Sequence, residues 1–390
     1  MELKNQPVKV AIVVCAWPPQ GGGIGNNAYY HAKYLPRLGY RVSAFTPAFA
    51  KIKKVHQAGI WLEYVPVWLP LGKAGFLFPL LKKLKDFDLI HLYYPFFGTD
   101  LIVWWFKFWH REKKLVIHYE MDPVGQGGKR FLFWLYLKLF LGPLVKISDR
   151  VAVLSWDNAK GSYLKKYLKK YPAKFVEIPN GIDIDIFRPK PKYVALKDGI
   201  GIGPGEKVVA FAGGLGRLHF FKGVEVLIKA VASLKNKKVK LLIIGDGEMR
   251  EHYEQLAKNL GLAEQVIFTG WVANDSLADY YNLADIFVLP STARTESFGI
   301  VVAEAQACGV PAIVANWPGV RATIEDGKTG LLVEPKNEID LAQKIRGLLA
   351  EKEIRKAMSE AGRERAVRLY DWNKVLVKLD QVYQELLTQK

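Results

Sequence analysis

The chain has 390 residues, of which 50% are hydrophobic and 24% charged, so it is too long for one ordinary core and too apolar to be disordered. Only two cysteines occur, Cys15 and Cys308, each in an apolar run, which excludes a disulfide framework and favours a reducing cytoplasm. The formal net charge of +18 requires an anionic partner, whether nucleic acid, acidic lipid or a phosphorylated ligand.

The first half of the chain alternates between strand-like and helix-like runs. The strand-like runs are residues 8–15, 41–46, 89–92, 115–118, 150–154 and 174–178, and the helix-like runs are 25–38 and 131–147. This alternation is typical of a parallel, doubly wound sheet. The first run is short and leads directly into Trp17 and Pro18, so we interpret it as a strand and not as a signal peptide.

The same pattern restarts after a stretch rich in proline and glycine, residues 188–205, which we expect to be a linker and hinge. Strands are predicted at 207–212, 239–245, 266–269, 285–289 and 312–315, and helices at 224–234, 250–260, 275–282, 300–308, 339–349 and 354–387. We therefore expect an α/β fold of two doubly wound, Rossmann-like domains facing each other across a cleft. The domains would comprise residues 1–185 and 186–371, with residues 372–390 packing back on the first domain.

Two carboxylates eight positions apart, Glu296 and Glu304, are the most informative feature of the second half. Glu296 follows the predicted strand 285–289, and ligands of open α/β sheets collect at the carboxyl ends of the strands. Glu304 lies in the following helix and can point the same way. The alternative is that one carboxylate stabilises a helix end and the other is a surface residue.

Cations and glycines lie at two other strand-to-helix junctions. Arg217 and Lys222, five positions apart, could clamp both phosphates of a diphosphate, or simply form a solvated basic loop. The run Gly21-Gly22-Gly23 could let backbone amides approach a phosphate, although it matches neither a Walker loop nor a dinucleotide fingerprint. The alternative for these glycines is a tight turn alone.

His118 ends the predicted strand 115–118 and is followed by Tyr119, Glu120, Met121 and Asp122. A lone histidine beside an apolar strand is more often a core residue than a catalytic one. Its place at the carboxyl end of a strand nevertheless makes a polar contact with substrate plausible.

Together these positions resemble glycosyltransferase family 4, which has the GT-B fold, over essentially the whole chain. The matching segments are Gly22-Gly23, His118 to Asp122, Pro179 to Asp183, Gly214 to Arg217 with Lys222-Gly223, Gly245-Asp246-Gly247, and Glu296 to Gly299 with Glu304. The resemblance implies a hexosyltransferase that moves a sugar from a nucleoside-diphosphate sugar with retention of configuration. It implies no required metal or other cofactor.

The resemblance also implies a role for each matching residue. Arg217 and Lys222 would hold the diphosphate, with Gly214 and Gly245 in the donor-binding loops, and Glu304 would bind the ribose hydroxyls. Glu296 would lie at the sugar with the backbone amides of Phe298 and Gly299. His118 would approach the sugar from the other domain, Gly22 and Gly23 would border the reaction centre, and Tyr119 and Asp122 would lie on the acceptor side. The motifs favour a UDP-sugar donor, and GDP-mannose users look much alike.

These roles fit the chemistry, because cleavage of a glycosyl–diphosphate bond develops negative charge on the leaving group, which positioned cations stabilise. A glycoside hydrolase would instead place two carboxylates about 5–10 Å apart across the scissile bond. A dinucleotide-dependent oxidoreductase would need a glycine fingerprint that this sequence lacks. A phosphorylase of the same fold would need a lysine-bound pyridoxal phosphate and a much larger chain.

The distribution of the positive charge suggests where the acceptor side lies. Aromatic residues such as Phe96, Trp109 and Phe131 are interleaved in the first half with basic clusters, which are Lys82 to Lys85, Phe106 to Lys114, Lys129-Arg130, and Lys165-Lys166 with Lys169-Lys170. Such a surface suits an anionic bilayer, and we expect a lipid-linked acceptor and a peripheral protein on the cytoplasmic face of the plasma membrane. No run reaches the roughly 18–20 uninterrupted apolar residues of a spanning helix. The alternatives are aromatic residues that form the core, a soluble acceptor, or a nucleic-acid-binding protein, although the clusters do not match an RNA-binding strand signature.

Overall fold

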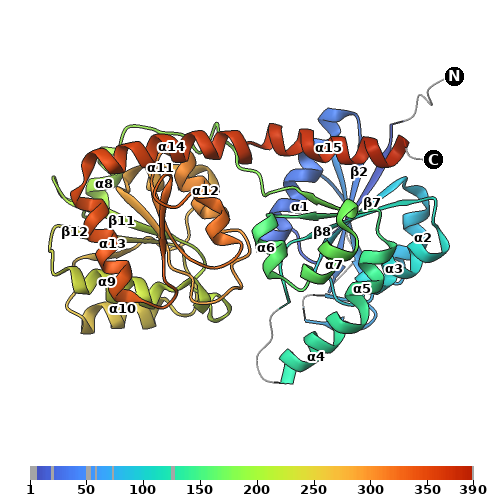
Figure 1. Ribbon diagram of the computed structural model, residues 1–390, viewed down its shortest axis with the longest axis horizontal. Coiled ribbons are helices and arrows are strands. Elements are labelled where there is room, and N and C mark those ends of the chain that lie inside the picture. The colour runs from blue at the N-terminus through green and yellow to red at the C-terminus, as the bar shows by residue number, and fades with distance from the viewer. Residues whose placement is uncertain are drawn as a thin grey trace. The chain divides into compact units, whose positions relative to one another are not determined.

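The computed structural model describes residues 7–18, 22–49, 54–57, 59–72, 74–123 and 128–388. The chain forms two compact units, one of Met1–Asn180 with Val375–Lys390 and the other of Gly181–Lys374. Each unit contains its own α/β sheet, as Figure 1 shows. The two Rossmann-like units and the return of the C-terminal helix to the first unit confirm the predicted fold class.

The sheet of the first unit has the order β10-β9-β8-β7-β1-β2-β4-β3, and among its described strands only the pairing of β3 with β4 is antiparallel. Its strands are β1 (Lys9–Val13), β2 (Arg41–Ala48), β3 (Lys54–Gln57), β4 (Ile60–Pro66), β7 (Leu89–Tyr94), β8 (Lys114–Tyr119), β9 (Arg150–Val153) and β10 (Phe175–Glu177). A separate small hairpin pairs β5 (Pro70–Leu71) with β6 (Ala74–Gly75).

The helices of this unit are α1 (Gly22–Tyr34), α2 (Leu80–Lys83), α3 (Thr99–Trp109), α4 (Gly128–Tyr136), α5 (Gly142–Ile147), α6 (Trp156–Gly161), α7 (Lys165–Lys170) and most of α15 (Trp372–Thr388). The predicted helix 131–147 exists, but a π-helical turn at Leu137–Leu141 divides it into α4 and α5. Strands β3 and β4 and helix α3 were not predicted.

Successive residues of β7 point to opposite faces of the sheet, as in any strand. Ile90, Leu92 and Tyr94 belong to the apolar core that also contains Phe106 of α3 and Leu144 of α5. His91 and Tyr93 alternate with them and are also fully buried. The first sheet therefore has one apolar face and one face whose buried layer is partly polar.

The sheet of the second unit is parallel throughout its described strands, in the order β13-β12-β11-β14-β15-β16. Its strands are β11 (Lys207–Ala212), β12 (Val239–Ile244), β13 (Val266–Phe268), β14 (Ile286–Leu289), β15 (Ala312–Ala315) and β16 (Gly330–Val333). The chain builds outward from β11 to β13 and then returns to place β14 on the other side of β11. This reversal is the topological switch point of the sheet.

Helices cover both faces of this second sheet. They are α8 (Val194–Gly199), α9 (Val224–Leu234), α10 (Arg250–Asn259), α11 (Asn274–Leu283), α12 (Ile300–Ala307), α13 (Glu338–Ala350) and α14 (Lys352–Tyr370). In Figure 1, α9 and α10 lie on one side of the sheet and α11, α12 and α14 on the other. Strand β16 was not predicted, and the predicted helix 354–387 is divided between α14 and α15 at Asp371.

The stretch 188–205 belongs to the second unit and contains α8, so its interpretation as a linker is wrong. The backbone amide of Lys190 donates to Asn282 Oδ1 at 2.9 Å, and the Lys190 ammonium pairs with Asp279 at 2.9 Å. Proline and glycine here shape a segment that packs on α11, and the boundary between the units lies at Asn180–Gly181.

Candidate active site

The loops that follow β11 and β14 meet at the switch point of the second sheet. The backbone amide of Thr292 donates to the carbonyl of Phe221 at 2.6 Å, which ties the two loops together. Gly223 has φ 79°, and a Cβ there would lie 2.0 Å from the carbonyl oxygen of Pro290. Glycine is therefore required where the first loop passes the second.

Lys222 and Glu296 are the charged residues that these loops bring together. Lys222 ends a 3₁₀ turn, Arg217–Lys222, and its Nζ lies 2.7 Å from Glu296 Oε2. Each side chain is only 14% exposed. Burial of this extent makes the pair more than a surface ion pair, because solvent screens it less.

Arg217 begins the same turn but has a different environment. Its backbone amide donates to Glu248 Oε2 at 2.9 Å, and the residue is exposed. Arg217 therefore occupies an exposed position at the start of the turn.

Gly214 and Gly245 follow β11 and β12, and each is packed closely against neighbouring atoms. Gly245 follows β12 with φ 144°, and a Cβ there would lie 2.0 Å from the carbonyl oxygen of Gly213. A Cβ at Gly214 would lie 3.0 Å from His219 Nδ1. Both glycines thus permit close packing of the loops at the carboxyl ends of β11 and β12.

Glu304 lies in α12 and is 8% exposed. The hydroxyl of Tyr281 donates to its Oε2 at 2.9 Å. Burial raises the pKa of Glu304 to about 7, and the hydrogen bond from Tyr281 opposes this rise. Glu304 therefore changes its charge near neutral pH, unlike an exposed carboxylate.

Phe298 and Gly299 directly precede α12, and Gly299 is its N-cap. The Phe298 ring is 3% exposed and packs edge-on against Tyr370 at 5.3 Å between ring centroids. Gly299 has φ 77°, and a Cβ there would lie 2.9 Å from Val320 Cγ2. The Phe298 side chain is thus part of the core.

In the first unit, Gly22 and Gly23 open α1, and Gly21 lies outside the described residues. Gly22 has φ 57°, and a Cβ at either position would have no atom of the described residues within 4 Å.

His118 lies in β8, next to its last residue, and is completely buried. Its Nδ1 lies 3.3 Å from His91 Nε2, and its Nε2 lies 3.5 Å from Asn27 Nδ2 and 3.8 Å from Glu120 Oε1. The side-chain amide of Asn27 is hydrogen-bonded to Glu120 Oε1 at 2.6 Å. The structure therefore places His118 inside a network of hydrogen bonds.

Tyr119 and Asp122 interact with each other. The Tyr119 hydroxyl donates to Asp122 Oδ1 at 2.6 Å, and the Tyr119 ring stacks on Tyr94 in the apolar core. Asp122 also accepts from the backbone amide of Tyr163 at 3.3 Å. Tyr119 therefore points to the opposite face of the sheet from His118, and its hydroxyl contacts Asp122 of the following loop.

Sequence reasoning gave no role to the other polar residues around His118. They are Asn27 and His31 of α1, His91 and Tyr93 of β7, Glu120, and Tyr383 of α15. The alternation of polar and apolar residues in Leu89-Ile90-His91-Leu92-Tyr93 could have revealed part of this layer. The participation of Tyr383 could not be read from sequence.

Burial keeps this layer uncharged. It lowers the pKa of His118 to about 3 and raises that of Glu120 to about 8. Burial and the neighbouring His118 also lower the pKa values of His31 and His91 well below their usual range. Near neutral pH the three histidines are neutral, and Glu120 is largely protonated.

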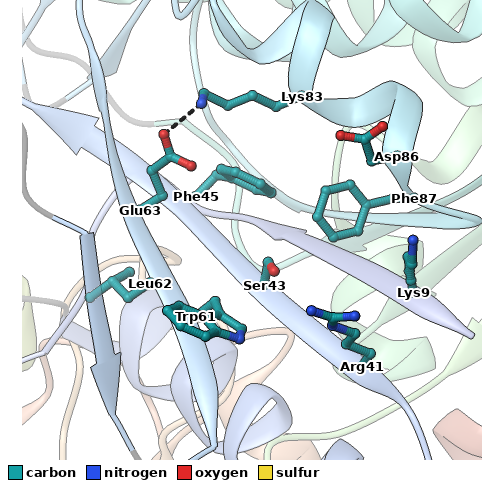
Figure 2. Close-up of a pocket in the computed structure, with 10 residues that line it drawn as sticks. All are labelled: Lys9, Arg41, Ser43, Phe45, Trp61, Leu62, Glu63, Lys83, Asp86 and Phe87. Atoms are coloured by element: carbon teal, nitrogen blue, oxygen red, sulfur yellow. Dashed lines mark ion pairs between the residues drawn. The ribbon is translucent and has the colours of Figure 1, made fainter. Parts of the chain in front are cut away.

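A separate hollow of about 400 Å³ lies at the other end of the first sheet, near the first residues of β1 and β2. Figure 2 shows Lys83 reaching toward Glu63 beside it, with an Nζ–Oε1 distance of 2.6 Å. Their side chains are 29% and 16% exposed. This hollow is remote from the carboxyl ends of the strands, where ligands of such sheets bind.

Two family descriptions match the chain and together account for most of it. "Glycosyltransferase Family 4" matches residues 21–186, and "Glycosyl transferases group 1" matches residues 196–365. The chain belongs to glycosyltransferase family 4. The two matches together cover both halves of the chain, in agreement with the resemblance found in the motifs.

Relatives within the family share about a third of their residues with this chain. A GDP-mannose-dependent alpha-(1-6)-phosphatidylinositol monomannoside mannosyltransferase of Mycobacterium tuberculosis is 36% identical over 257 residues, 63% of this chain. A D-inositol 3-phosphate glycosyltransferase of Segniliparus rotundus is 35% identical over 239 residues, 59% of this chain. The matches span 65% and 51% of those relatives' own lengths.

Solved structures show the same fold at low sequence identity. Anabaena HepE in complex with UDP has a TM-score of 0.80 at 20% identity, and the match covers 97% of this chain and 100% of HepE. Sucrose-phosphate synthase from Thermosynechococcus elongatus has a TM-score of 0.76 at 23% identity, with 98% and 100% covered. The family 4 chain therefore has the GT-B fold.

Proposed function

We propose that this protein is a retaining glycosyltransferase that moves a sugar from a nucleoside-diphosphate sugar to a lipid-linked acceptor at an anionic membrane surface. The observation that supports the donor reaction best is the 2.7 Å pair of Lys222 and Glu296 at the switch point of the second sheet. A cation and an anion held there can bind the charged and the neutral parts of one donor.

Lys222 and Arg217 would act on the diphosphate. The leaving diphosphate gains negative charge as the glycosyl bond breaks, and a cation fixed before the reaction stabilises that charge without reorganising. Lys222 is fixed by Glu296, whereas the exposed Arg217 can close on the phosphates as they arrive. The loops beside Gly214 and Gly245 would border the same group.

Glu304 and Glu296 would bind different ends of the donor. Glu304 offers carboxylate oxygens to the ribose hydroxyls from a rigid helix, and Tyr281 orients it. Glu296 would lie at the sugar, close to the backbone of Phe298 and Gly299. His118 would contact the sugar, Gly22 and Gly23 would border the reaction centre, and Tyr119 and Asp122 would serve the acceptor side. These roles require no metal.

Assays that compare UDP with GDP, and their sugar nucleotides, would identify the base of the donor. The motifs favour UDP, whereas the name of the mycobacterial relative specifies GDP-mannose. We expect one nucleotide to raise the thermal midpoint of the purified protein, and the matching sugar nucleotide to be slowly hydrolysed in the absence of acceptor. If neither UDP nor GDP shifts the midpoint and no sugar nucleotide is consumed, the proposed function is wrong.

A surface on α3, α4, α5 and α7 supports the membrane part of the proposal. Trp109, Phe131 and Leu132 are each more than 60% exposed there, and Trp105 is half exposed. In Figure 1, α4 extends from α5 away from the sheet of its unit. None of the helices that the structure describes is long and apolar enough to span a bilayer. Exposed large aromatic residues of this kind suit the interface of a bilayer.

The cations of this surface stand over aromatic rings. Lys138 lies 4.9 Å from the ring centre of Trp134, Lys166 lies 4.7 Å from that of Tyr167, and Lys170 lies 5.3 Å from that of Tyr171. These residues line two hollows of about 240 and 440 Å³ whose described walls contain no acidic residue. A surface with cations beside exposed rings complements anionic headgroups above acyl chains.

Not every residue of the predicted basic and aromatic surface belongs to it. Lys107 is 4% exposed, pairs with Asp149 at 2.9 Å and donates to the backbone carbonyl of Arg111 at 3.0 Å. Phe96 lies in the apolar core. The prediction is therefore wrong for these two residues, because burial and not sequence position decides which residues reach the surface.

Vesicle flotation tests the membrane surface separately from catalysis. We expect the triple variant Lys138→Ala, Lys166→Ala and Lys170→Ala to lose at least about tenfold in partitioning to phosphatidylglycerol vesicles, because each lysine near such a surface contributes about 1 kcal/mol. The matched control changes Lys237, Lys238 and Lys258, which are exposed in the second unit. Equal loss in both variants would contradict a local surface. Tighter binding to random oligonucleotides than to vesicles would favour the nucleic-acid alternative.

A further inference from the structure

A chain of hydrogen bonds connects the C-terminal helix to His118. The hydroxyl of Tyr383 in α15 lies 2.6 Å from His91 Nδ1, although the two residues are 292 positions apart. His91 Nε2 lies 3.3 Å from His118 Nδ1. All three side chains are completely buried, so water does not compete for these bonds.

We infer that Tyr383 is a positioning residue that, through His91, fixes the ring proton of His118 on Nε2. The inference rests on the proposed function for its catalytic meaning, since it states what His118 can offer to a sugar. The tautomer itself is a property of the folded protein, whatever reaction the protein catalyses.

The direction of the chain follows from the number of available protons. A buried tyrosine hydroxyl that only accepted a hydrogen bond would leave its own O–H unsatisfied, which is unfavourable where no water can replace the missing partner. Within the described residues, His91 is the hydrogen-bond partner of the Tyr383 hydroxyl. Tyr383 therefore donates to His91 Nδ1, and Nδ1 of His91 carries no proton.

The rest follows because both histidines are neutral and each has one ring proton. With Nδ1 unprotonated, His91 has its proton on Nε2 and donates to His118 Nδ1. His118 must then have its own proton on Nε2. Burial lowers the pKa values of both rings, which supports the neutral state. A backbone hydrogen bond with Ile178 raises the pKa of His118, but by less than burial lowers it.

The Nε2 of His118 lies 3.5 Å from the side-chain amide of Asn27 and 3.8 Å from Glu120 Oε1. A proton on Nε2 therefore requires the amide oxygen of Asn27, and not its nitrogen, to face His118. The same oxygen then accepts from the protonated carboxyl group of Glu120. A proton on Nε2 makes His118 a hydrogen-bond donor, and prevents it from acting as a base or nucleophile through that atom. His118 would therefore donate to an oxygen of the sugar or of its acceptor. The C-terminal helix would influence transfer without contacting either substrate.

Long-range ¹H–¹⁵N correlation spectra of the full chain labelled at histidine test this inference directly. Seven histidines contribute, and His91→Gln and His118→Gln identify their own signals by loss. We expect both His91 and His118 to be protonated on Nε2 in the wild-type protein. A proton on Nδ1 of His118 would overturn the relay, even if sugar transfer is confirmed.

Tyr383→Phe then tests the first step of the relay. Loss of its hydroxyl should give a mixture of His118 tautomers and reduce kcat by about tenfold, the worth of one hydrogen bond, with the donor KM unchanged. Tyr40→Phe is the matched control, because its hydroxyl also holds α15, through Asp380 at 2.5 Å and Gln384 at 2.9 Å, but does not touch His91.

We expect Tyr40→Phe to retain the wild-type tautomer and turnover. A Tyr383→Phe protein with an unchanged His118 spectrum would refute the relay. If that variant does not fold, the wild-type spectrum still decides the tautomer. Absence of any transferase activity would remove the catalytic meaning while the measured tautomer stands.

Discussion

The carboxyl ends of the two sheets carry polar clusters of opposite character. In the second unit, Lys222 and Glu296 form a partly exposed ion pair. In the first unit, His91, His118 and Glu120 are buried. Burial lowers the pKa values of the two histidines and raises that of Glu120, which favours the neutral form of each side chain. A charged loop suits a diphosphate, whereas a neutral layer suits hydroxyl groups, which need donors and acceptors but no counter-charge. Two sheets of the same type thus carry chemically different side chains at their carboxyl ends.

The largest expected effect comes from removing the charge of the second cluster. Lys222→Ala should reduce sugar transfer by about a hundredfold or more, since one preorganised contact with a developing anion is worth that much. Measurement of kcat/KM together with the thermal midpoint separates this loss from unfolding. Lys83→Ala is the control, because it breaks a comparable pair, at 2.6 Å, in the hollow of Figure 2.

Turnover of Lys83→Ala should stay near that of the wild type. Equal losses in the two lysine variants would show that the position of the pair at the switch point has no special importance. Near-normal turnover of Lys222→Ala would remove the proposed diphosphate contact.

The neutral cluster should reveal itself through the pH dependence of stability. Burial raises the pKa of Glu120 to about 8, so the folded state retains a proton that the unfolded state loses above its usual value of 4.5. Stability that depends on Glu120 is therefore lost as pH rises from about 4.5 to 8. Between about pH 6.5 and 8.5 the contribution is about 2 kcal/mol at most.

Urea unfolding of the wild type and of Glu120→Gln at these two pH values measures this effect. The amide cannot ionise, so the variant should lose less stability than the wild type between the two values. The wild-type loss also contains contributions from Asp100 and Glu304, whose pKa values are raised to about 7, and the difference between the proteins isolates Glu120. Parallel losses in the two proteins would show that Glu120 is ionised throughout.

A smaller effect should distinguish Glu304 from its neighbour Glu296. The pKa of Glu304 is raised to about 7, so the carboxylate form that accepts from two ribose hydroxyls becomes dominant as pH rises. Donor affinity should increase by up to about tenfold between pH 6 and 8 in the wild type. Calorimetry with Glu304→Gln should give weaker and pH-independent binding, and a preserved pH dependence would assign the titration to another group.

Much of the second unit could be predicted because its signals are local. The strand 207–212 and the helix 224–234 have the predicted bounds, since an apolar run and a period of 3.6 are properties of neighbouring residues. Strand β16 was missed because Gly330-Leu331-Leu332-Val333 is too short to stand out before its pairing with β15 is known. In the tail, Asp371 breaks a pattern that otherwise suits one long helix.

The sequence by itself determined the two α/β halves, the family and the loops on which Arg217, Lys222, Glu296 and Glu304 lie, because motifs and periodicity depend on short spacings. The tertiary structure alone decided that Lys222 pairs with Glu296 and that Tyr383 reaches His91. Those contacts depend on which strands are neighbours and on where the last helix packs. A hydrogen bond across 292 positions leaves no trace in local sequence, because it is the strand order and the return of α15 that bring its two ends together.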